Sequence, residues 1–204
     1  MSYPARVVDS PALLSALLGY LLGSIPFGLL LTRAAGLGDI RKIGSGNIGA
    51  TNVLRTGNKP LAAAVLLLDG IKGAAAVLLG LHLAGSNGAF AGGLSAVVGH
   101  MFPVWLKFHG GKGVATGFGV LLAAAWPAGL AAGVVWLAIF RLSRISSAGA
   151  LAAFAAAPVF AWFAAGPELA LLALLITFLV FVRHEQNIRR LLAGTESRIS
   201  FSKS

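Results

Sequence analysis

The sequence predicts an all-α integral membrane protein with seven transmembrane helices, two of which are short and form a hairpin. Its composition is 57% hydrophobic and only 11% charged, whereas a soluble domain typically carries about 25% charged residues. The mean hydropathy is +0.87, and the apolar residues fall in runs long enough to cross a bilayer as helices. No shift in composition marks off a soluble part, so residues 1–204 are expected to form a single membrane domain.

The first half of the chain contains three apolar runs. Residues 11–32 form the first, which is longer than the core of a signal peptide and lacks an A-x-A-like cleavage site, so we expect a retained helix. A polar stretch, residues 33–60, separates it from the second run, residues 61–84. A short Gly-Ser-Asn turn then leads to the third run, residues 88–106.

The second half begins with an apolar segment, residues 114–140, that is long for one span and contains Trp126 and Pro127 near its middle. Proline lacks a backbone donor and disfavours helix at the residue before it. Lys and Arg flank both ends of the segment, which places both ends on one side of the membrane and predicts two short helices. Two further runs, residues 147–165 and 168–182, precede a basic tail.

The distribution of positive charge predicts the orientation of these helices. The turns at residues 85–87 and 166–168 carry no Lys or Arg, whereas every cation-rich segment falls on the other side of the arrangement. Because cytoplasmic loops carry the excess of Lys and Arg, the N-terminus is expected outside and the C-terminus in the cytoplasm. The cation-rich segments are residues 33–59, residues 107–112, residues 141–144 and the tail from residue 183.

Net charge and rare residue types limit the partners. The formal charge of +10 would suggest nucleic acid in a soluble protein. In a membrane protein it fits cytoplasmic loops and anionic headgroups, so we expect membrane lipid and no nucleic acid as partner. The chain has no cysteine, which excludes disulfides, thiolate metal sites and a Cys nucleophile. His82, His100 and His109 have no carboxylate or His at ligand spacing, so neither metal nor cofactor is expected.

The first polar segment, residues 44–55, reads GSGNIGATNVLR and formally contains the dinucleotide fingerprint G-x-G-x-x-G. That fingerprint needs a βαβ unit, which does not fit between membrane helices. Closely spaced glycines can nevertheless turn amides toward an anion, while hydroxyl, amide and guanidinium side chains add donors. The alternative is a flexible connecting loop. The candidate phosphate ligands here are Ser45, Gly46, Asn47, Gly49, Thr51, Asn52 and Arg55.

The second segment, residues 110–116, reads GGKGVAT and opens a membrane helix. It is not a Walker A loop, because Leu106 stands where the first glycine is needed and Gly follows the lysine. A glycine-rich approach to a helix N-terminus still collects free amides and the positive end of the helix dipole. A plain membrane anchor is the alternative. The candidate ligands are Gly110, Gly111, Lys112, Gly113 and Thr116.

The third segment, residues 184–196, is expected to be helical. Three-residue spacing then places His184, Asn187 and Arg190 on one face, and Arg189 adds a further cation. His184 at a helix end is suited to donate a hydrogen bond or to act as an acid or base. A solvated basic tail that only sets orientation is the alternative.

Two further pairs of polar residues lie among the apolar runs. Asp69 and Lys72 sit three residues apart inside the second run, where charges are costly and are functional or mutually paired. They either bind substrate or form an ion pair that braces the first loop. Ser146 and Ser147 begin a later run, and helix capping explains one of them.

Several enzyme chemistries are excluded by the sequence. No His is followed five positions later by Asp, so the H-x4-D arrangement of common acyltransferases is absent. There is also no G-x-S-x-G elbow and no carboxylate pair on a shared loop. Any catalysis must therefore rest on positioned donors and cations.

Taken together, these segments resemble the PlsY family of bacterial glycerol-3-phosphate acyltransferases, which use acyl phosphate as donor. The motifs occur in the order typical of the family and cover nearly the whole chain. The matching stretches are residues 23–28 (GSIPFG), 45–55 (SGNIGATNVLR), 69–73 (DGIKG), 99–105 (GHMFPVW), 110–116 (GGKGVAT) and 184–191 (HEQNIRRL).

The resemblance implies a seven-helix protein of the bacterial inner membrane whose motifs face the cytoplasm. It implies transfer of an acyl chain from acyl phosphate to the 1-hydroxyl of glycerol 3-phosphate, which gives lysophosphatidic acid and phosphate. Glycerol phosphate would be clamped by Ser45, Arg55, Lys112, His184 and Asn187. The amides of residues 46–49 and the hydroxyls of Thr51 and Ser147 would hold the leaving phosphate. The base is either His184 or a substrate phosphate.

Two other classes of protein use similar residues. A transporter for a phosphorylated metabolite would need sites near the midplane that both sides reach, which the one-sided motifs and the lack of inverted repeats disfavour. A lipid-binding scaffold would need only general basic patches and leaves the Gly-Ser-Asn-Thr pattern unexplained.

Overall fold

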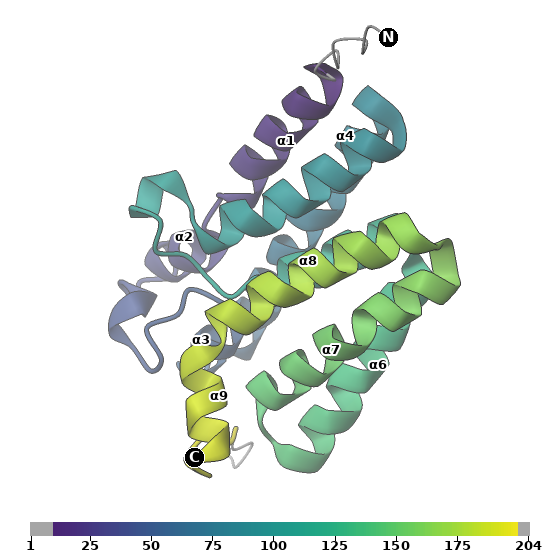
Figure 1. Cartoon of the computed structure of the whole chain (residues 1–204). Helices are drawn as coiled ribbons and strands as arrows, with labels where there is room; N and C mark the ends of the chain where they lie inside the picture. Colours follow the sequence, from purple (N-terminus) through teal and green to yellow (C-terminus); the bar gives the residue numbers. More distant parts are fainter. Residues whose placement is uncertain (1–9, 200–204) are drawn as a thin grey trace, which may run out of the picture.

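The computed structural model describes residues 10–199, in which all the regular structure is helical. This confirms the predicted all-α class. Figure 1 shows the helices as a bundle, with the N-terminal end of α1 far from α9. The elements are α1 (Ser10–Gly23), α2 (Phe27–Ala34), η1 (Ile40–Lys42), α3 (Ala50–Leu54), α4 (Lys59–Met101), η2 (Val104–Leu106), α5 (Val114–Ala124), α6 (Trp126–Ser143), α7 (Ser146–Ala165), α8 (Pro167–Arg183) and α9 (Glu185–Leu192).

α4 is two antiparallel arms joined by a tight bend. The backbone leaves helical geometry at Ala84 and Gly85, where Gly85 adopts φ 58° and ψ −144°, a conformation that favours glycine. Next to the bend the backbones of the two arms are in direct contact. A Cβ added to Gly80 would lie only 2.0 Å from the carbonyl oxygen of Gly88. The structure therefore confirms two helical runs separated by a turn near residues 85–87.

The first apolar run is broken, which the sequence analysis did not predict. α1 ends at Gly23 and α2 starts at Phe27, because Pro26 lacks a backbone donor and disfavours helix before it. Two distant side chains satisfy the carbonyls that the break leaves open. The ammonium of Lys72 donates to the oxygen of Ile25 at 2.8 Å, and the indole of Trp105 donates to the oxygen of Ser24 at 2.8 Å.

The predicted hairpin within residues 114–140 is confirmed. α5 and α6 are separated by Ala125, whose extended backbone (φ −156°, ψ 95°) precedes the proline in the first turn of α6. At about 1.5 Å per residue, the 11 residues of α5 extend only about 16 Å, which is roughly half the hydrocarbon core. α5 is therefore as short as predicted, whereas α6, with 18 residues, is long enough to span a bilayer, so only one of the two helices is short.

Within residues 10–199, four helical segments are long and apolar enough to span a bilayer, and a fifth is obtained if α8 and α9, bent by 66°, count as one. One of the four is the whole of α4, whose two arms run antiparallel. Close backbone contacts hold the bundle together: a Cβ on Gly119 would lie 1.9 Å from the oxygen of Gly70, so only glycine permits this approach of α5 to α4.

Candidate active site

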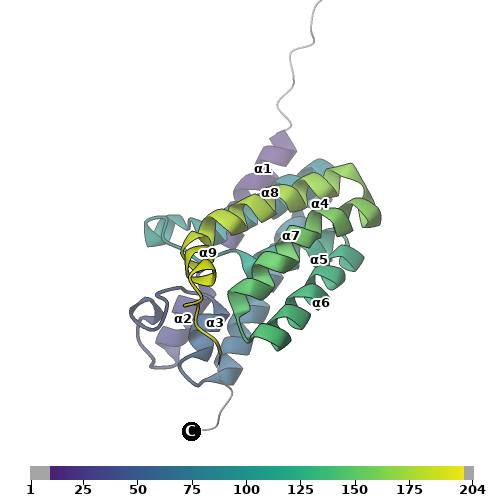
Figure 2. The same cartoon turned by 60° about the horizontal axis from the view of Figure 1, so that its bottom comes forward.

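A single large cavity, of about 1270 Å³, brings the three predicted polar segments together. It lies toward the end of the bundle where α2, α3 and α9 gather, and Figure 2 shows the tail after α9 running past α3. Its polar part is formed by the loop before α3, the loop before α5, the start of α7, and α9 with the tail that follows. The sequence-predicted residues that line it are Ser45, Gly46, Asn47, Gly49, Thr51, Asn52, Arg55, Asp69, Gly110, Lys112, Gly113, Ser146, Ser147, His184 and Asn187.

The first loop is organised around the buried side chain of Asn52. Its amide group donates to the backbone oxygens of Ile40, Ile43 and Asn47 at 3.0, 2.9 and 2.8 Å. Its oxygen accepts from the amide of Ser45 at 3.0 Å. The donors of its amide group are thus directed at the loop itself, so Asn52 shapes this side of the site.

Two amides of the expected anion nest are already engaged within the loop. The amide of Gly46 donates to the oxygen of Ile43 at 3.0 Å, and that of Gly49 donates to the side-chain oxygen of Asn47 at 2.9 Å. A compact loop must satisfy its own amides, and these two are satisfied internally. The expectation is corrected for these two glycines, and the loop also offers side chains to the cavity, notably Ser45 and Arg55.

The glycines of the second loop also serve close packing. The amides of Gly110 and Gly111 donate to the oxygens of Met101 and His100 at 3.1 and 3.0 Å, so they are not free phosphate ligands. A Cβ on Gly111 would lie 2.0 Å from the ring Nε2 of His100. Gly113 adopts φ 78°, which directs the chain into α5. These glycines hold the loop against the end of α4 and thereby place Lys112 in the cavity.

Lys112 is the central cation of the polar part. Its ammonium donates to the side-chain oxygen of Asn187 at 2.5 Å, which links the second and third segments. Burial lowers the pKa of Lys112 to about 8; the charge of Glu196 opposes this, and the charges of Arg190 and Arg55 reinforce it. A crowded group of cations of this kind is suited to bind a strongly negative ligand.

His184 is buried at the junction of α8 and α9. Its Nδ1 lies 2.8 Å from the oxygen of Val180, which can only accept, so the proton of the neutral ring sits on Nδ1 and Nε2 carries the lone pair. Burial, with the charge of Lys112, lowers the pKa of His184 to about 4. The ring is therefore neutral at physiological pH.

The serines at the start of α7 have partners from two other segments. The hydroxyl of Ser146 lies 3.1 Å from that of Thr51, which joins α7 to α3. The hydroxyl of Ser147 donates to Glu196 at 2.8 Å. Both serines line the cavity, and Ser147 is already engaged by a protein carboxylate.

Asp69 and Lys72 form a buried ion pair with a structural partner. The ammonium of Lys72 lies 2.7 Å from the carboxylate of Asp69 and donates to Ile25 at the break between α1 and α2. His100 lies 3.6 Å from the same carboxylate. Of the two roles considered for the pair, this geometry favours bracing, although the segment braced is the break between α1 and α2 and not the first loop.

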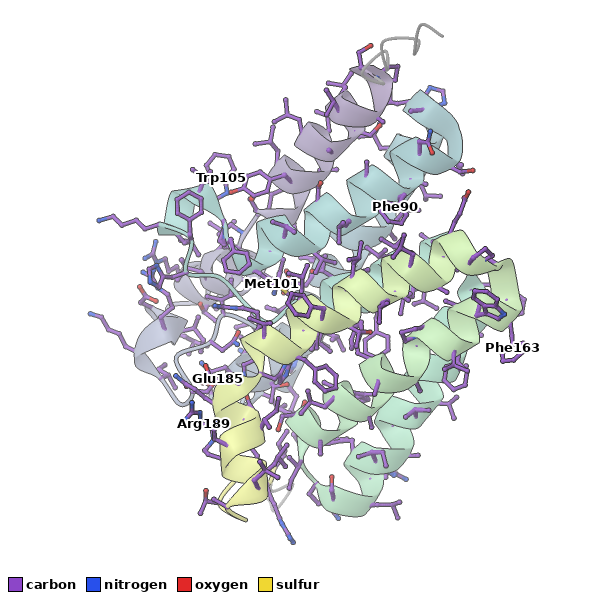
Figure 3. The ribbon with its side chains drawn as sticks, viewed as in Figure 1. Phe90, Met101, Trp105, Phe163, Glu185 and Arg189 are labelled. Carbon is purple, nitrogen blue, oxygen red and sulfur yellow. The ribbon has the colours of Figure 1, made fainter. Side chains whose placement is uncertain are left out.

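Four predicted site residues lie outside the cavity. Lys72 and Thr116 are buried in helix contacts, and Gly111 packs on His100. Arg189 pairs with Glu185 on the exposed side of α9, as Figure 3 shows, because its position is one residue off the inward face. The structure places Arg190 in the cavity in its stead.

The cavity is also lined by residues outside the predicted ligand set. Among them are Arg190, Glu196 and Ser197, of which the last two belong to the tail after α9. Helical spacing had already placed Arg190 on one face with His184 and Asn187, and all three line the cavity. No pattern in the neighbouring sequence identifies Glu196 and Ser197 as site residues, because they reach the cavity only where the tail folds back over it.

The cavity continues into an apolar groove. Its walls come from one arm of α4, from α5 and from α6, and every contributing helix presents residues at helical spacing. The groove is lined by Leu66, Leu67, Ile71, Phe118, Leu122, Leu130, Val134 and Leu137.

Among the described residues, no group of three His, Cys, Asp or Glu is arranged to hold a metal ion.

Comparison with known proteins identifies the family. A sequence model of the family described as glycerol-3-phosphate acyltransferase matches residues 13–194. The chain belongs to this family. Glycerol-3-phosphate acyltransferases from Mesorhizobium japonicum and Paramagnetospirillum magneticum are 59% and 61% identical to it, over 92% and 91% of this chain and 95% and 92% of theirs.

Solved structures of the family have the same fold. The chain is similar to the crystal structure of PlsY (YgiH), an integral membrane glycerol 3-phosphate acyltransferase, in its glycerol 3-phosphate form. The TM-score is 0.88 at 40% identity, and the match covers 93% of this chain and 96% of that one. The lysophosphatidic acid form of the same protein gives a TM-score of 0.86 at 39% identity.

Proposed function

We propose that this protein transfers an acyl chain from acyl phosphate to the 1-hydroxyl of sn-glycerol 3-phosphate, forming 1-acyl-sn-glycerol 3-phosphate and phosphate. One observation carries the proposal: a cation-rich polar chamber and an apolar groove between membrane helices form one continuous cavity. The chamber suits the phosphates of two substrates, and the groove suits the acyl tail of one. The names of the relatives and of the similar crystal structures support glycerol 3-phosphate as the acceptor.

The reaction needs orientation and charge stabilisation more than a protein nucleophile. Acyl phosphate is a mixed anhydride, so the hydroxyl oxygen attacks the acyl carbon directly and the bond from that carbon to the phosphate oxygen breaks. Negative charge gathers on the acyl oxygen and then on the departing phosphate, where nearby cations stabilise it. Arg183 lines the cavity but is bound to the oxygens of Gly110 and Gly111. The cations we assign to the chamber are Lys112, Arg55 and Arg190, and they also hold glycerol phosphate in place.

The proton of the attacking hydroxyl has two candidate acceptors. Neutral His184 presents the lone pair of Nε2, but a pKa of about 4 makes it a weak base. A phosphate monoester has a second pKa near ~6 and is the better acceptor at neutral pH. We therefore assign the proton to a substrate phosphate, and His184 helps to hold the acceptor in place without taking its proton.

The membrane arrangement is part of the proposal. We count seven spans: α1 with α2, the two arms of α4, the α5–α6 hairpin, α7 and α8. The N-terminus lies outside, and the C-terminus and the chamber face the cytoplasm of a bacterial inner membrane. The distribution of Lys and Arg supports this orientation. Residues 1–204 act as one domain, the acyl donor enters from the lipid, and no cofactor takes part.

The test is direct. Purified protein is incubated with an acyl phosphate and labelled glycerol 3-phosphate, and lysophosphatidic acid is measured, with acyl thioesters as parallel donors. Lys112→Ala should lose at least about 100-fold in rate, whereas Lys59→Ala, an exposed lysine outside the cavity, should be unaffected. Transfer from thioesters alone would replace the proposed donor, and no transfer from either donor would refute the function.

A further inference from the structure

The tail after α9 returns a carboxylate to the centre of the site. Gly194, with φ 68°, ends the helix, and the amide of Thr195 donates to the oxygen of Arg190 at 2.8 Å. This turn places Glu196 in the cavity, where its side chain is only 6% exposed. Ser197 accepts from Arg55 at 2.8 Å, and the amide of Ile199 donates to the oxygen of Arg144, so the tail is fixed on both sides of the carboxylate.

Three donors from two helices bind this carboxylate. Ser147 of α7 donates at 2.8 Å, and Asn187 of α9 donates through its amide nitrogen at 2.5 Å to the same oxygen. Arg190 donates to the other oxygen at 2.5 Å. Burial alone would raise the pKa of Glu196, but hydrogen bonds from Arg190, Ser147 and Asn187 more than offset it and hold the pKa below its usual range. The group is therefore an anion at neutral pH.

The bond to Glu196 decides which way the Asn187 amide faces. A primary amide has one end that donates and one that accepts. Because the nitrogen of Asn187 is committed to Glu196, the oxygen must face Lys112, whose ammonium it accepts at 2.5 Å. In the flipped amide two donors would oppose each other. The carboxylate thus fixes the position of the ammonium through one intermediate side chain.

Glu196 also acts on Lys112 through its charge. Arg190, Arg55 and Arg183 all disfavour a further positive charge at Lys112, as does burial, whereas the charge of Glu196 favours it. We propose that Glu196 is a positioning residue for the acyl transfer described above: it orients Asn187 and keeps Lys112 placed and protonated for the substrate phosphate, without itself contacting substrate. The inference rests on the proposed function for its role in catalysis, but not for its effect on Lys112.

The first experiment does not require activity. The pH dependence of Lys112 acetylation by acetic anhydride, measured by mass spectrometry on the full-length protein in detergent, gives the pKa of this lysine. Glu196→Gln should lower that pKa by about one unit, since it removes a nearby opposite charge. Glu168→Gln is the matched control, because Glu168 is an exposed carboxylate in the first turn of α8 and does not line the cavity. Equal values in native protein and Glu196→Gln would overturn the proposal.

The second experiment measures transfer. Glu196→Gln should reduce kcat/KM roughly tenfold or more, as expected for a lost charge-assisted hydrogen bond, and should move the alkaline fall of the kcat/KM profile to lower pH. A merely structural role would lower activity without moving that limb. The double variant Asn187→Asp with Glu196→Gln places the carboxylate directly beside Lys112 and should return the limb toward its native position. Failure of this return would contradict control by charge.

A second variant tests the proposal if Glu196→Gln fails to fold. If Glu196→Gln is not recovered from membranes, Glu196→Asp keeps the charge but withdraws it by one methylene, and we expect a smaller downward shift of the same pKa and limb. An unchanged Lys112 in that variant would refute the proposal. Native protein that labels as expected but forms no lysophosphatidic acid would refute the proposed function and leave the link between Glu196 and Lys112 standing.

Discussion

At the scale of single residues, the site is a balance of charges in a confined space. Lys112, Arg55 and Arg190 line one chamber with a single tail carboxylate, Glu196, among them. Excess positive charge of this kind is costly when the chamber is empty and is relieved when a phosphate binds. The titration of Lys112 therefore reports directly on substrate binding.

The pH dependence of kcat/KM should follow Lys112. Its pKa is lowered to about 8, so the ammonium is present below pH 8 and is lost as the pH rises through that value. Because kcat/KM reports groups of the free enzyme, we expect it to fall above about pH 8, while kcat falls at higher pH, since bound phosphate favours the ammonium. Steady-state kinetics between pH 6 and 10 check this. A flat profile through pH 9 would show that the charge of Lys112 is not required.

His184→Gln separates the two candidate bases. Glutamine can accept a hydrogen bond but cannot take the proton, so a base role would cost about 100-fold or more and would remove an acidic limb near pH 4. If a substrate phosphate is the base, we expect a smaller loss, together with an acidic limb near ~6, the second pKa of a phosphate monoester, in both proteins. The pH–rate profiles of native protein and variant decide between them.

At the scale of elements, breaks in helices and close glycine contacts position the loops. The break before α2 frees the carbonyl of Ile25, and the first arm of α4 supplies the ammonium of Lys72 that satisfies it. α5 can approach α4 because Gly119 meets Gly70 without side chains. Each of these two contacts joins two helices, so neither contact can be predicted from the sequence of one helix alone.

Lys72→Met should destabilise the fold more than its loss of one contact suggests. It leaves the carboxylate of Asp69 buried without its ammonium, at a cost of about 3–5 kcal/mol. Adding Asp69→Asn removes the stranded charge and should restore part of that loss. Thermal unfolding in detergent measures both. If the single variant melts with the native protein, the pair does not brace the break.

Gly133→Leu should shorten the acyl groove. Gly133 lines the cavity on α6, and a Cβ added there would meet no atom within 4 Å, so a larger side chain can enter the groove without strain. It lies about 6 Å along the helix from Leu137. We expect kcat/KM for long-chain acyl phosphates to fall about tenfold or more, with short chains little affected. Ala138→Leu, exposed on the same helix outside the cavity, is the control. Equal losses for all chain lengths would contradict this role.

At the scale of the whole molecule, all the phosphate-directed parts lie at one end of the bundle. Figures 1 and 2 show α2, α3 and α9 together there, while the N-terminal end of α1 is distant. A transporter would need a site open to both sides. One-sided loops joined to a groove between helices suit an enzyme that draws one substrate from the lipid and the other from the cytoplasm.

The orientation can be tested with single cysteines, because the chain has none of its own. Ser86, in the bend of α4, and Lys42, in η1, are both exposed and lie in segments assigned to opposite sides of the membrane. In intact cells, an impermeant thiol reagent should modify Ser86→Cys but not Lys42→Cys, which should react only after the membrane is opened. The reverse pattern would invert the proposed topology.

Much of the fold was predictable because its causes are local. The α5–α6 hairpin followed from a proline and from like charges at both ends of residues 114–140. The break before α2 was missed, since the apolar run through Pro26 looked continuous. Gly46, Gly49 and Gly110 line the cavity and Gly111 packs beside it, but closely spaced glycines have the same pattern whether their amides face a ligand or a neighbouring carbonyl.

The sequence by itself determined that this is a helical membrane protein of the glycerol-3-phosphate acyltransferase family, with Lys112, His184 and Asn187 in polar segments between apolar runs. Periodicity, charge and motif order are properties of the chain alone. Only the tertiary structure decided that Glu196 and Ser197 of the tail reach the cavity, and that Glu196 binds Asn187 there. The physical reason is that hydrogen-bond partners and burial depend on segments distant in sequence, which meet only when the bundle closes.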